Sequence, residues 1–509
     1  MKMKMWVIFI IILLIANTGC IDQQSEVKYQ GKTVIKCCFS ENQSISPVGF
    51  NNNQLTLLPN IYNGLVEFDG SFQLVPSLAV SWSNPEDNIW HFQLRKNVSF
   101  HNGAEFTSQD VAFSIYQYYS LSLIVENITL INSHSIDIIT KEPEPMFLQK
   151  IARNLFIYPH NYSLVDNDYW RIGTGPYQLS EYVEGNYSKI SYFEDYWGEK
   201  PDIENVYLYV ISDEQQRIDK FLNGDFDLIE YNINESINNL SHLTSIDIHT
   251  YSPLSTYILG FDMRVNDSYG YSDGMNPTSY QNIRKAMYHA INDKELIEEA
   301  FQGYARTSTQ LLTTYHFGYT PTIKRLEYNI SLAKALLNES IFPDGFHIEL
   351  DAITIGFDYN KKQAELIKNQ LGSIGINVTI NNLTTTEFHN KVIYQKNTSL
   401  WLVGWTINSI DGGLMYPQFF MSEGDNYQGF YNSGHYVNAE VDQIGLNALH
   451  EMDIGKRNDL FQKGYRIAQQ DDIAIIPLLT QELILLTVDN LELKPRADST
   501  LIFEEISFQ

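Results

Sequence analysis

The chain has 509 residues, too many for one small hydrophobic core, so we expect two or three lobes. Hydrophobic residues make up 44% of it, as in globular proteins, and 34 Lys and Arg against 61 Asp and Glu give a net charge of −27. Such a surface repels anionic lipid and nucleic acid, whose affinity for proteins comes largely from phosphate neutralisation. The composition argues against nucleic acid as a partner and indicates a soluble, acidic, extracytoplasmic protein.

The N-terminus predicts export. MKMKM supplies positive charge, and the apolar run at 6–16 is 11 residues long, whereas a membrane-spanning helix needs about 20. This is typical of a secretory signal. Small residues precede Cys20, as in lipoprotein signals, so we expect a signal peptide at 1–20, lipid attachment at Cys20 and a polar tether at 21–32. An uncleaved signal anchor is the alternative, because Asn17 stands where such signals usually carry an aliphatic residue.

The first predicted strand, TVIKCCF, carries two adjacent cysteines, Cys37 and Cys38. Neighbouring cysteines rarely pair, because the small ring that they would close is strained. We expect buried thiols here, with a soft-metal or redox role as the alternative.

The next elements predict an α/β chain. Residues 88–95 alternate at period two, as a half-buried strand does, and 108–120 predict a helix with Thr107 or Ser108 as its N-cap. In RIGTGPY, Gly173 and Gly175 predict a tight bend; no capping helix follows, which argues against a phosphate cradle.

Helices and strands alternate through the second half. Residues 279–301 predict two amphipathic helices with a break near Asn292, and 331–340 predict another helix. In 360–383, a helix that stops at Gly372 or Gly375 precedes the strand INVTI. This order builds α/β lobes around a parallel or mixed sheet.

The stretch WLVGWTINSIDGG, residues 401–413, has two interpretations. In a strand, Trp401, Val403 and Trp405 would share one face. The first interpretation is an edge strand that packs its aromatic rings and ends in a turn with a solvated Asp411. The second is the wall of a binding cleft with a polar anchor at its end.

Many segments occur in a characteristic order from residue 33 to the end. They include NIYNGLVEFDG, PSLAVSW, IWHFQLRKNVSFHNGAEFTSQDVAFS, RIGTGPYQL, RIDKFLNGDFDLI, NIRKAMYHAINDKELI, AELIKNQLGSIGINVTI, LWLVGW and DIAIIPLL. Each is weak alone. Together they resemble the family 5 extracellular solute-binding proteins of ABC importers, the peptide-, dipeptide- and nickel-binding group.

The resemblance implies an α/β, two-lobed periplasmic-binding-protein-like fold of type II, cluster C. Lobe I would contain residues 33–257 and 480–509, with an extra subdomain inserted at about 56–170, and lobe II residues 258–479. The segments STYILGFDMR and IAIIPLLTQ would form a two-strand hinge. Hinge closure around a ligand is the motion expected of such proteins.

The resemblance also implies ligand contacts in the WLVGWTINSIDGG stretch. Peptide-binding relatives keep an aspartate, which pairs with the ligand's α-ammonium, where this chain has Asn408, after Gly404 and Trp405. An amide cannot neutralise a buried ammonium. We therefore expect a solute without a free α-ammonium, or one that Asp411 meets instead.

Further candidates rest on their places in the family pattern. Arg153 stands where some relatives carry an arginine that faces an anionic ligand or a chelate carboxylate, and a guanidinium suits bidentate carboxylate binding. Arg306 and Tyr315 fall on loops that line the cleft in the family, and Tyr431 and His435 follow the segment that carries Trp405. The alternative for Arg153 is a surface arginine on a helix.

The function implied is an extracytoplasmic receptor, held by lipid on the outer face of the cytoplasmic membrane, that delivers a peptide-like or other small solute to ABC permease and ATPase subunits. We expect a monomer without a cofactor. The 12 histidines form no ligand-spaced cluster, so no metal site of the chain's own is expected. Neither G-x-S-x-G nor H-E-x-x-H occurs, so no enzyme is expected. A chelated-metal (nickel-type) binding protein and a sensory surface receptor with the same fold are the alternatives.

Overall fold

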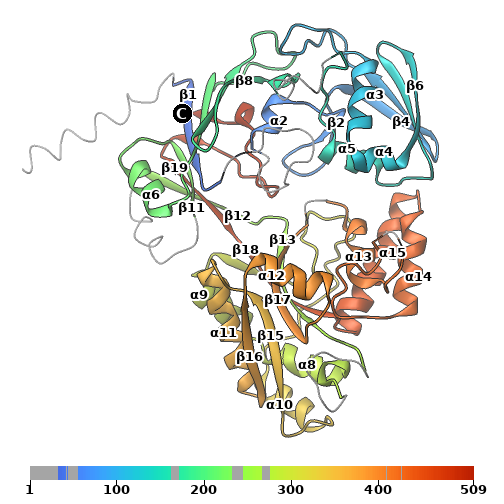
Figure 1. Cartoon of the computed structure of the whole chain (residues 1–509), viewed down its shortest axis with the longest axis vertical. Coiled ribbons are helices and arrows are strands. Elements are labelled where there is room, and N and C mark those ends of the chain that lie inside the picture. The colour runs from blue at the N-terminus through green and yellow to red at the C-terminus, as the bar shows by residue number, and fades with distance from the viewer. Residues whose placement is uncertain are drawn as a thin grey trace, which may run out of the picture.

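A computed structural model describes residues 32–41, 43, 56–161, 171–231, 245–265, 275–407, 410–425 and 427–509. The predicted signal peptide with Cys20, and Asn408, lie outside these residues. Two lobes lie one above the other in Figure 1, and each is built on its own large sheet. We call the part on the seven-stranded sheet lobe I and the part on the six-stranded sheet lobe II. The expected two-lobed α/β fold is confirmed.

The sheet of lobe I has the order β12-β19-β11-β1-β10-β9-β8. Its strands are β1 (Val34–Phe39), β8 (Tyr177–Val183), β9 (Tyr187–Tyr192), β10 (Asn205–Val210), β11 (Leu228–Tyr231), β12 (Ile246–Tyr251) and β19 (Leu483–Val488). The buried strand β1 runs parallel to both neighbours, β10 and β11. Cys37 and Cys38 on β1 are free, fully buried thiols, as predicted.

An inserted part extends lobe I to the right in Figure 1. It contains the four-stranded sheet β4-β5-β7-β6 and the hairpin β2-β3. Its elements are β2 (Val66–Phe68), β3 (Leu74–Pro76), β4 (Ala79–Glu86), β5 (Ile89–Leu94), α3 (Ser108–Gln117), α4 (Tyr119–Ile124), β6 (Val125–Asn132), β7 (Ser135–Thr140) and α5 (Phe147–Asn154). β5 alternates between buried and partly buried residues, and Thr107 is the N-cap of α3 with Asp110 in its capping box, as predicted.

The sheet of lobe II has the order β14-β18-β13-β17-β15-β16. Its strands are β13 (Ser255–Phe261), β14 (Ala305–Thr307), β15 (Phe346–Ile353), β16 (Ile376–Leu383), β17 (Leu400–Thr406) and β18 (Ile475–Gln481). β17 lies between β13 and β15, so the expectation of an edge strand is wrong. The expectation that Trp401, Val403 and Trp405 share a face is confirmed, because all three pack in one core.

Helices cover both faces of this sheet. One face carries α8 (Gln281–Ala290), α9 (Asp293–Phe301), α10 (Ile330–Asn338) and α11 (Asp358–Gly372), and the other carries α13 (Tyr416–Phe420), α14 (Ala439–Leu449) and α15 (Ile454–Arg466). The predicted break between two helices falls between α8 and α9, where Asn292 caps α9. Between α11 and β16, Gly375 has a φ of 97°, as the predicted left-handed turn requires.

The chain passes between the large sheets twice, from β12 to β13 and from β18 to β19. Within lobe I, the short helix α2 (Leu58–Ile61) packs against the predicted bend at 173–176. A Cβ on Gly173 would lie 2.0 Å from the Ile61 carbonyl oxygen, so this contact requires glycine. Among the described residues, no helix is long and apolar enough to cross a membrane.

Candidate functional site

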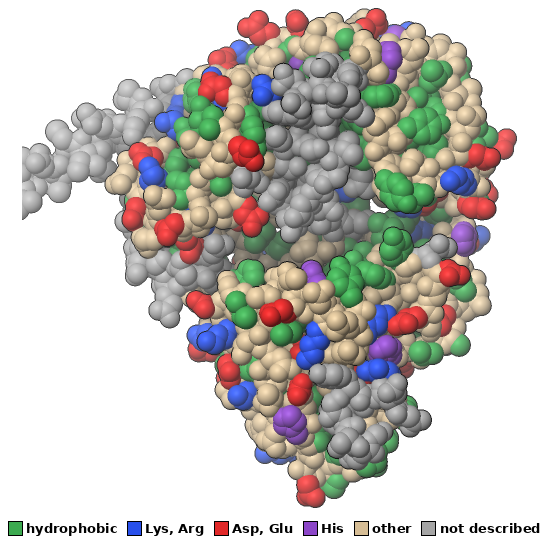
Figure 2. All heavy atoms as spheres, viewed as in Figure 1, with side chains coloured by type: hydrophobic (Ala, Val, Ile, Leu, Met, Phe, Trp, Pro, Cys, Tyr) green, Lys and Arg blue, Asp and Glu red, His purple; other side chains and the backbone are tan. Residues whose placement is uncertain are grey.

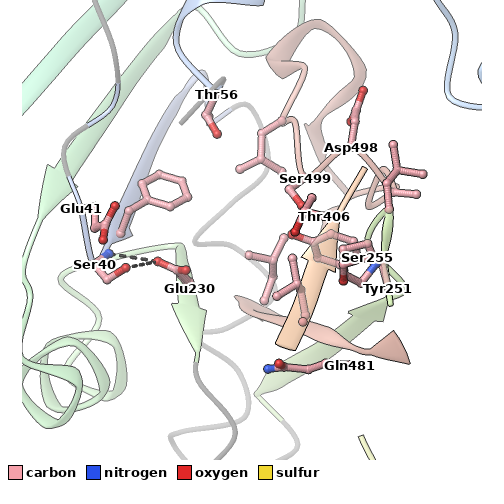
Figure 3. Close-up of a pocket in the computed structure, with 18 of the residues that line it drawn as sticks. Ser40, Glu41, Thr56, Glu230, Tyr251, Ser255, Thr406, Gln481, Asp498 and Ser499 are labelled. Atoms are coloured by element: carbon pink, nitrogen blue, oxygen red, sulfur yellow. Dashed lines mark hydrogen bonds between the residues drawn. The ribbon is translucent and has the colours of Figure 1, made fainter. Parts of the chain in front are cut away.

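A cavity of about 390 Å³ lies where the two lobes meet. Its walls come from strand ends of lobe I, strand ends of lobe II, and the two crossing segments with residues 497–499 and 501 of the C-terminal part (Figure 3). Cavities that bind small molecules typically measure roughly 300–1,000 Å³. The size therefore suits a small solute.

The wall from lobe I is acidic. Ser40 and Glu41 follow β1, and Glu230 lies on the parallel neighbour β11, so the ends of both strands meet at one edge of the sheet. The backbone N–H and the hydroxyl of Ser40 donate to Oε2 of Glu230 at 3.0 and 2.7 Å. These two bonds hold the carboxylate at the cavity wall.

The wall from lobe II comes from two antiparallel strands, where Ser255 pairs with Thr406 and Tyr257 with Gly404. A Cβ on Gly404 would lie 2.8 Å from the ring of Tyr257, so the glycine leaves room for this ring. The Tyr257 hydroxyl donates to Oδ1 of Asn360 at 3.0 Å. Burial raises the pKa of Tyr257 well above its usual value, which keeps the phenol neutral.

Backbone hydrogen bonds connect the first crossing to both neighbouring walls. Leu254 donates to the carbonyl of Ala497 at 3.1 Å, and its own carbonyl accepts from Ile407 at 2.6 Å. Leu254 and Ala497 both line the cavity, and Ile407 directly follows Thr406. A movement at this crossing would therefore displace the end of β17 and the C-terminal segment, because both are hydrogen-bonded to Leu254.

Trp405 and Tyr431 lie behind the cavity wall. Successive residues of a strand point to opposite faces, so Gly404 and Thr406 line the cavity while Trp405 packs into the core of lobe II. Its ring lies 4.4 Å from that of Tyr431 and 5.0 Å from that of Phe419. Of the predicted ligand residues within the described ranges, only Gly404 lines this cavity.

Asp411 is occupied inside lobe II. Its carboxylate accepts from Arg457 Nη1 at 2.6 Å and from the Gly413 N–H at 2.6 Å, and its residue exposure is 1%. Burial raises the pKa of Asp411, and the Arg457 guanidinium opposes this rise. The expected solvated turn is wrong, and the geometry gives the predicted ligand contact no support.

Arg153 lines a second cavity of about 270 Å³, which lies within lobe I between the hairpin β2-β3, α5 and the C-terminal segment. Its Nε and Nη2 atoms are buried and have no hydrogen-bond partner in the described part of the chain, so the alternative of a surface arginine is wrong. Burial lowers the pKa of Arg153, and Asp498, which lines both cavities, opposes this. Ligand contact by Arg153 stays a prediction.

Three other candidates lie apart from the cavity lining. Arg306 on β14 pairs with Glu482 and is largely exposed. Tyr315 projects from lobe II onto Phe72 of lobe I, with ring centroids 5.2 Å apart. His435 lies near the Phe261 end of β13, which is the far end of the strand from Ser255. The N–H of Met263 donates there to the carbonyl of Gly434, the residue before His435. Seven strand residues, roughly 20 Å, separate it from the cavity end of that strand.

The sequence interpretation missed most of the lining. Ser40, Glu41, Glu230 and Gln481 lie at or next to strand ends, and the rule that ligands bind at the carboxyl ends of parallel strands would have indicated the first three. In the described ranges, no group of three or more His, Cys, Asp or Glu side chains is arranged to hold a metal ion.

A family model, described as bacterial extracellular solute-binding proteins, family 5, matches residues 73–427, which is more than half of the chain. The chain belongs to this family. The resemblance to family 5 that the sequence motifs indicated is thus confirmed. The chain is a solute-binding protein, and its family functions in transport and is not an enzyme family.

The relatives of this family 5 protein differ in what their names say they bind. A dipeptide-binding protein of Escherichia coli is 25% identical over 78% of this chain and 81% of its own length, and a nickel-binding periplasmic protein of the same species is 26% identical over 66% and 68%. The solved structure of HbpA2 from Haemophilus parasuis matches 94% of this chain and all of its own at a TM-score of 0.81 and 21% identity, which supports the fold.

Proposed function

We propose that the chain is an extracytoplasmic receptor that closes on one small solute between its lobes and delivers it to the permease of an ABC importer. The observation that carries this proposal is the cavity lined by both lobes and both crossings, because a hinge movement there would open and close it. Peptide-like solutes fit its size and its many hydroxyl and amide groups. A nickel chelate is the alternative solute, because one relative is named as a nickel-binding periplasmic protein.

The test is to identify the bound solute and then to block the cavity. Native mass spectrometry of protein from its source reads the mass of the co-purified molecule, which separates a peptide from a metal chelate. Thr406→Trp places an indole in the cavity and is expected to lower the affinity for that molecule about tenfold or more in calorimetry. Thr379→Trp, on the exposed side of the edge strand β16, is the matched control. Equal binding by both variants would contradict the proposal.

We further propose that the chain itself performs no chemistry, acts as a monomer, and divides at the predicted boundaries near residues 257 and 479. ATP hydrolysis would belong to partner subunits. Incubation with labelled solute should return it unchanged. Turnover without partners would refute this part.

Membrane attachment is proposed through the N-terminal signal and lipid on Cys20, which the residue pattern at 1–20 supports. Cys20→Ser should release the protein from the membrane fraction. Continued retention would instead indicate an uncleaved anchor.

A further inference from the structure

We infer that the cavity between the lobes selects a solute whose enclosed part carries a positive charge and no free carboxylate. The inference rests on the proposed function and names the class of solute. It comes from the distribution of charge on the cavity walls.

Two of the three acidic residues that line the cavity lie at one end, and the third, Asp498, is paired with Arg496. Glu41 and Glu230 lie together on the left of the cavity in Figure 3, across from Ser255, Thr406 and Ser499. Both hydrogen bonds from Ser40 reach the same oxygen of Glu230, Oε2. The described residues donate no hydrogen bond to Oε1, so this oxygen remains for a ligand.

The lack of a cationic partner sets Glu230 apart from most enclosed acids of this molecule. Five aspartates with side-chain exposures below 10% each form an ion pair with a lysine or an arginine: Asp227, Asp262, Asp351, Asp411 and Asp498. Glu230 is partly buried, and no ion pair joins it to a base in the described ranges. A cationic group of a solute would supply the missing partner, and without one a closed cleft would enclose the carboxylate unpaired, which is costly.

The cavity offers nothing of the opposite sign. Its lining contains no Lys, Arg or His among the described residues. The internal stretches outside the described ranges, 42, 44–55, 162–170, 232–244, 266–274, 408–409 and 426, contain no lysine or arginine in their sequences. Arg496, beside the lining residue Ala497, is bound to Asp498 and to the carbonyl of Phe68. A carboxylate enclosed here would meet acidic groups and lack a charged partner, which discriminates against it.

The other end of the cavity suits uncharged groups, because its one acid, Asp498, is already paired with Arg496. Ser255, Thr406 and Ser499 present hydroxyls there, and Leu254 and Ala497 present apolar surface. A solute with a cationic head and a neutral polar or short apolar body matches this arrangement. The expectation of a solute without a free α-ammonium, which rested on Asn408, is thus replaced by that of a cationic solute whose charge Glu230 of lobe I meets.

The experiment presents one set of dipeptides in four terminal forms. Each sequence, with uncharged side chains, is supplied as the amide with a free ammonium, the zwitterion, the N-acetyl acid and the N-acetyl amide, in equal amounts. The full chain in detergent is incubated with the mixture, and the retained molecules are quantified by mass spectrometry after ultrafiltration. We expect the cationic amide to be retained about tenfold or more over the N-acetyl acid of the same sequence.

Two cavity variants and one control test whether this preference comes from the acidic end of the cavity. Glu230→Gln should reduce the ratio several-fold. Because Glu230 also holds Ser40, Glu41→Gln at the same end is the second variant, and a thermal melt checks that both are folded. Glu126→Gln, exposed on β6 of the inserted part, should leave the ratio unchanged.

Three results would overturn the inference: equal or better retention of the acids, a ratio unaffected by both cavity variants, or retention of none of the four forms. The Thr406→Trp variant separates this failure from failure of the proposed function. If acids are retained and Thr406→Trp abolishes their retention, the cavity binds solutes and only the charge preference is wrong. If Thr406→Trp changes no retention, the proposed function fails as well.

Discussion

Single residues around the cavity differ mainly in whether their charge is already satisfied. Asp411 stands near the position where a ligand anchor was expected, yet its carboxylate is bound by Arg457 and by a backbone N–H inside lobe II. Glu230 lies at the cavity, where the hydroxyl and the backbone N–H of Ser40 donate to its carboxylate. Burial of an ion pair removes both charges from ligand binding. Asp411 therefore serves the structure of lobe II, whereas the carboxylate of Glu230 remains to bind a ligand.

The buried Asp411–Arg457 pair should contribute strongly to the stability of lobe II. Asp411→Asn leaves the guanidinium of Arg457, whose side chain is 4% exposed, without its counter-charge. We expect a loss of about 3–5 kcal/mol in the free energy of unfolding, measured by urea denaturation. Asp471→Asn breaks the exposed pair with Arg466 and should cost less than about 1 kcal/mol. Equal losses of unfolding free energy in both variants would show that the buried pair contributes no more to stability than the exposed pair.

Among the elements, the loop before Phe317 is tied to the end of β17 by a buried histidine. His316 Nδ1 accepts from the backbone N–H of Thr313 at 3.0 Å, and its Nε2–H donates to the carbonyl of Ile407 at 3.1 Å. This arrangement fits only the neutral ring with its proton on Nε2. Burial lowers the pKa of His316 from 6.5 to about 4.

The free energy of unfolding should therefore decrease as the pH falls, because His316 is held neutral in the folded protein. Below about pH 6.5 the unfolded chain takes up a proton at His316, while the folded chain does not until about pH 4. Between these values we expect the wild type to lose up to about 3 kcal/mol more than His316→Gln, measured by urea denaturation at several pH values. His347→Gln, at an exposed position on β15, is the control and should retain the wild-type pH dependence. Parallel curves for wild type and His316→Gln would contradict this assignment.

In the whole molecule, the lobes touch each other outside the hinge. Tyr315 of lobe II packs on Phe72 of lobe I, and Met452 of lobe II packs against the core of lobe I. Acidic side chains are spread over both lobes of the face in Figure 2, which agrees with the net charge of −27. These apolar contacts thus hold together two lobes that carry charge of the same sign.

Tyr315→Ala should weaken this contact between the lobes without changing the cavity lining. An aromatic pair contributes about 0.5–1.5 kcal/mol beyond its buried area, so we expect solute affinity to fall roughly two- to tenfold. Calorimetry measures this, and small-angle X-ray scattering should show a larger radius of gyration. Tyr427→Ala, which removes a tyrosine that is 74% exposed in lobe II, should change neither quantity. An unchanged affinity in Tyr315→Ala would mean that the contact does not favour closure.

The sequence by itself determined the periodic elements and the family. The strand at 88–95, the helix after Thr107, the break at Asn292 and the shared face of Trp401, Val403 and Trp405 follow from spacing and capping within a few residues of the sequence. Only the tertiary structure decided the site. Whether Asp411 is free depends on Arg457, 46 positions away, and the cavity joins Ser40, Glu230, Thr406 and Gln481 from four strands or strand ends. Such neighbours are set by sheet order and by the crossings, which local sequence patterns do not encode.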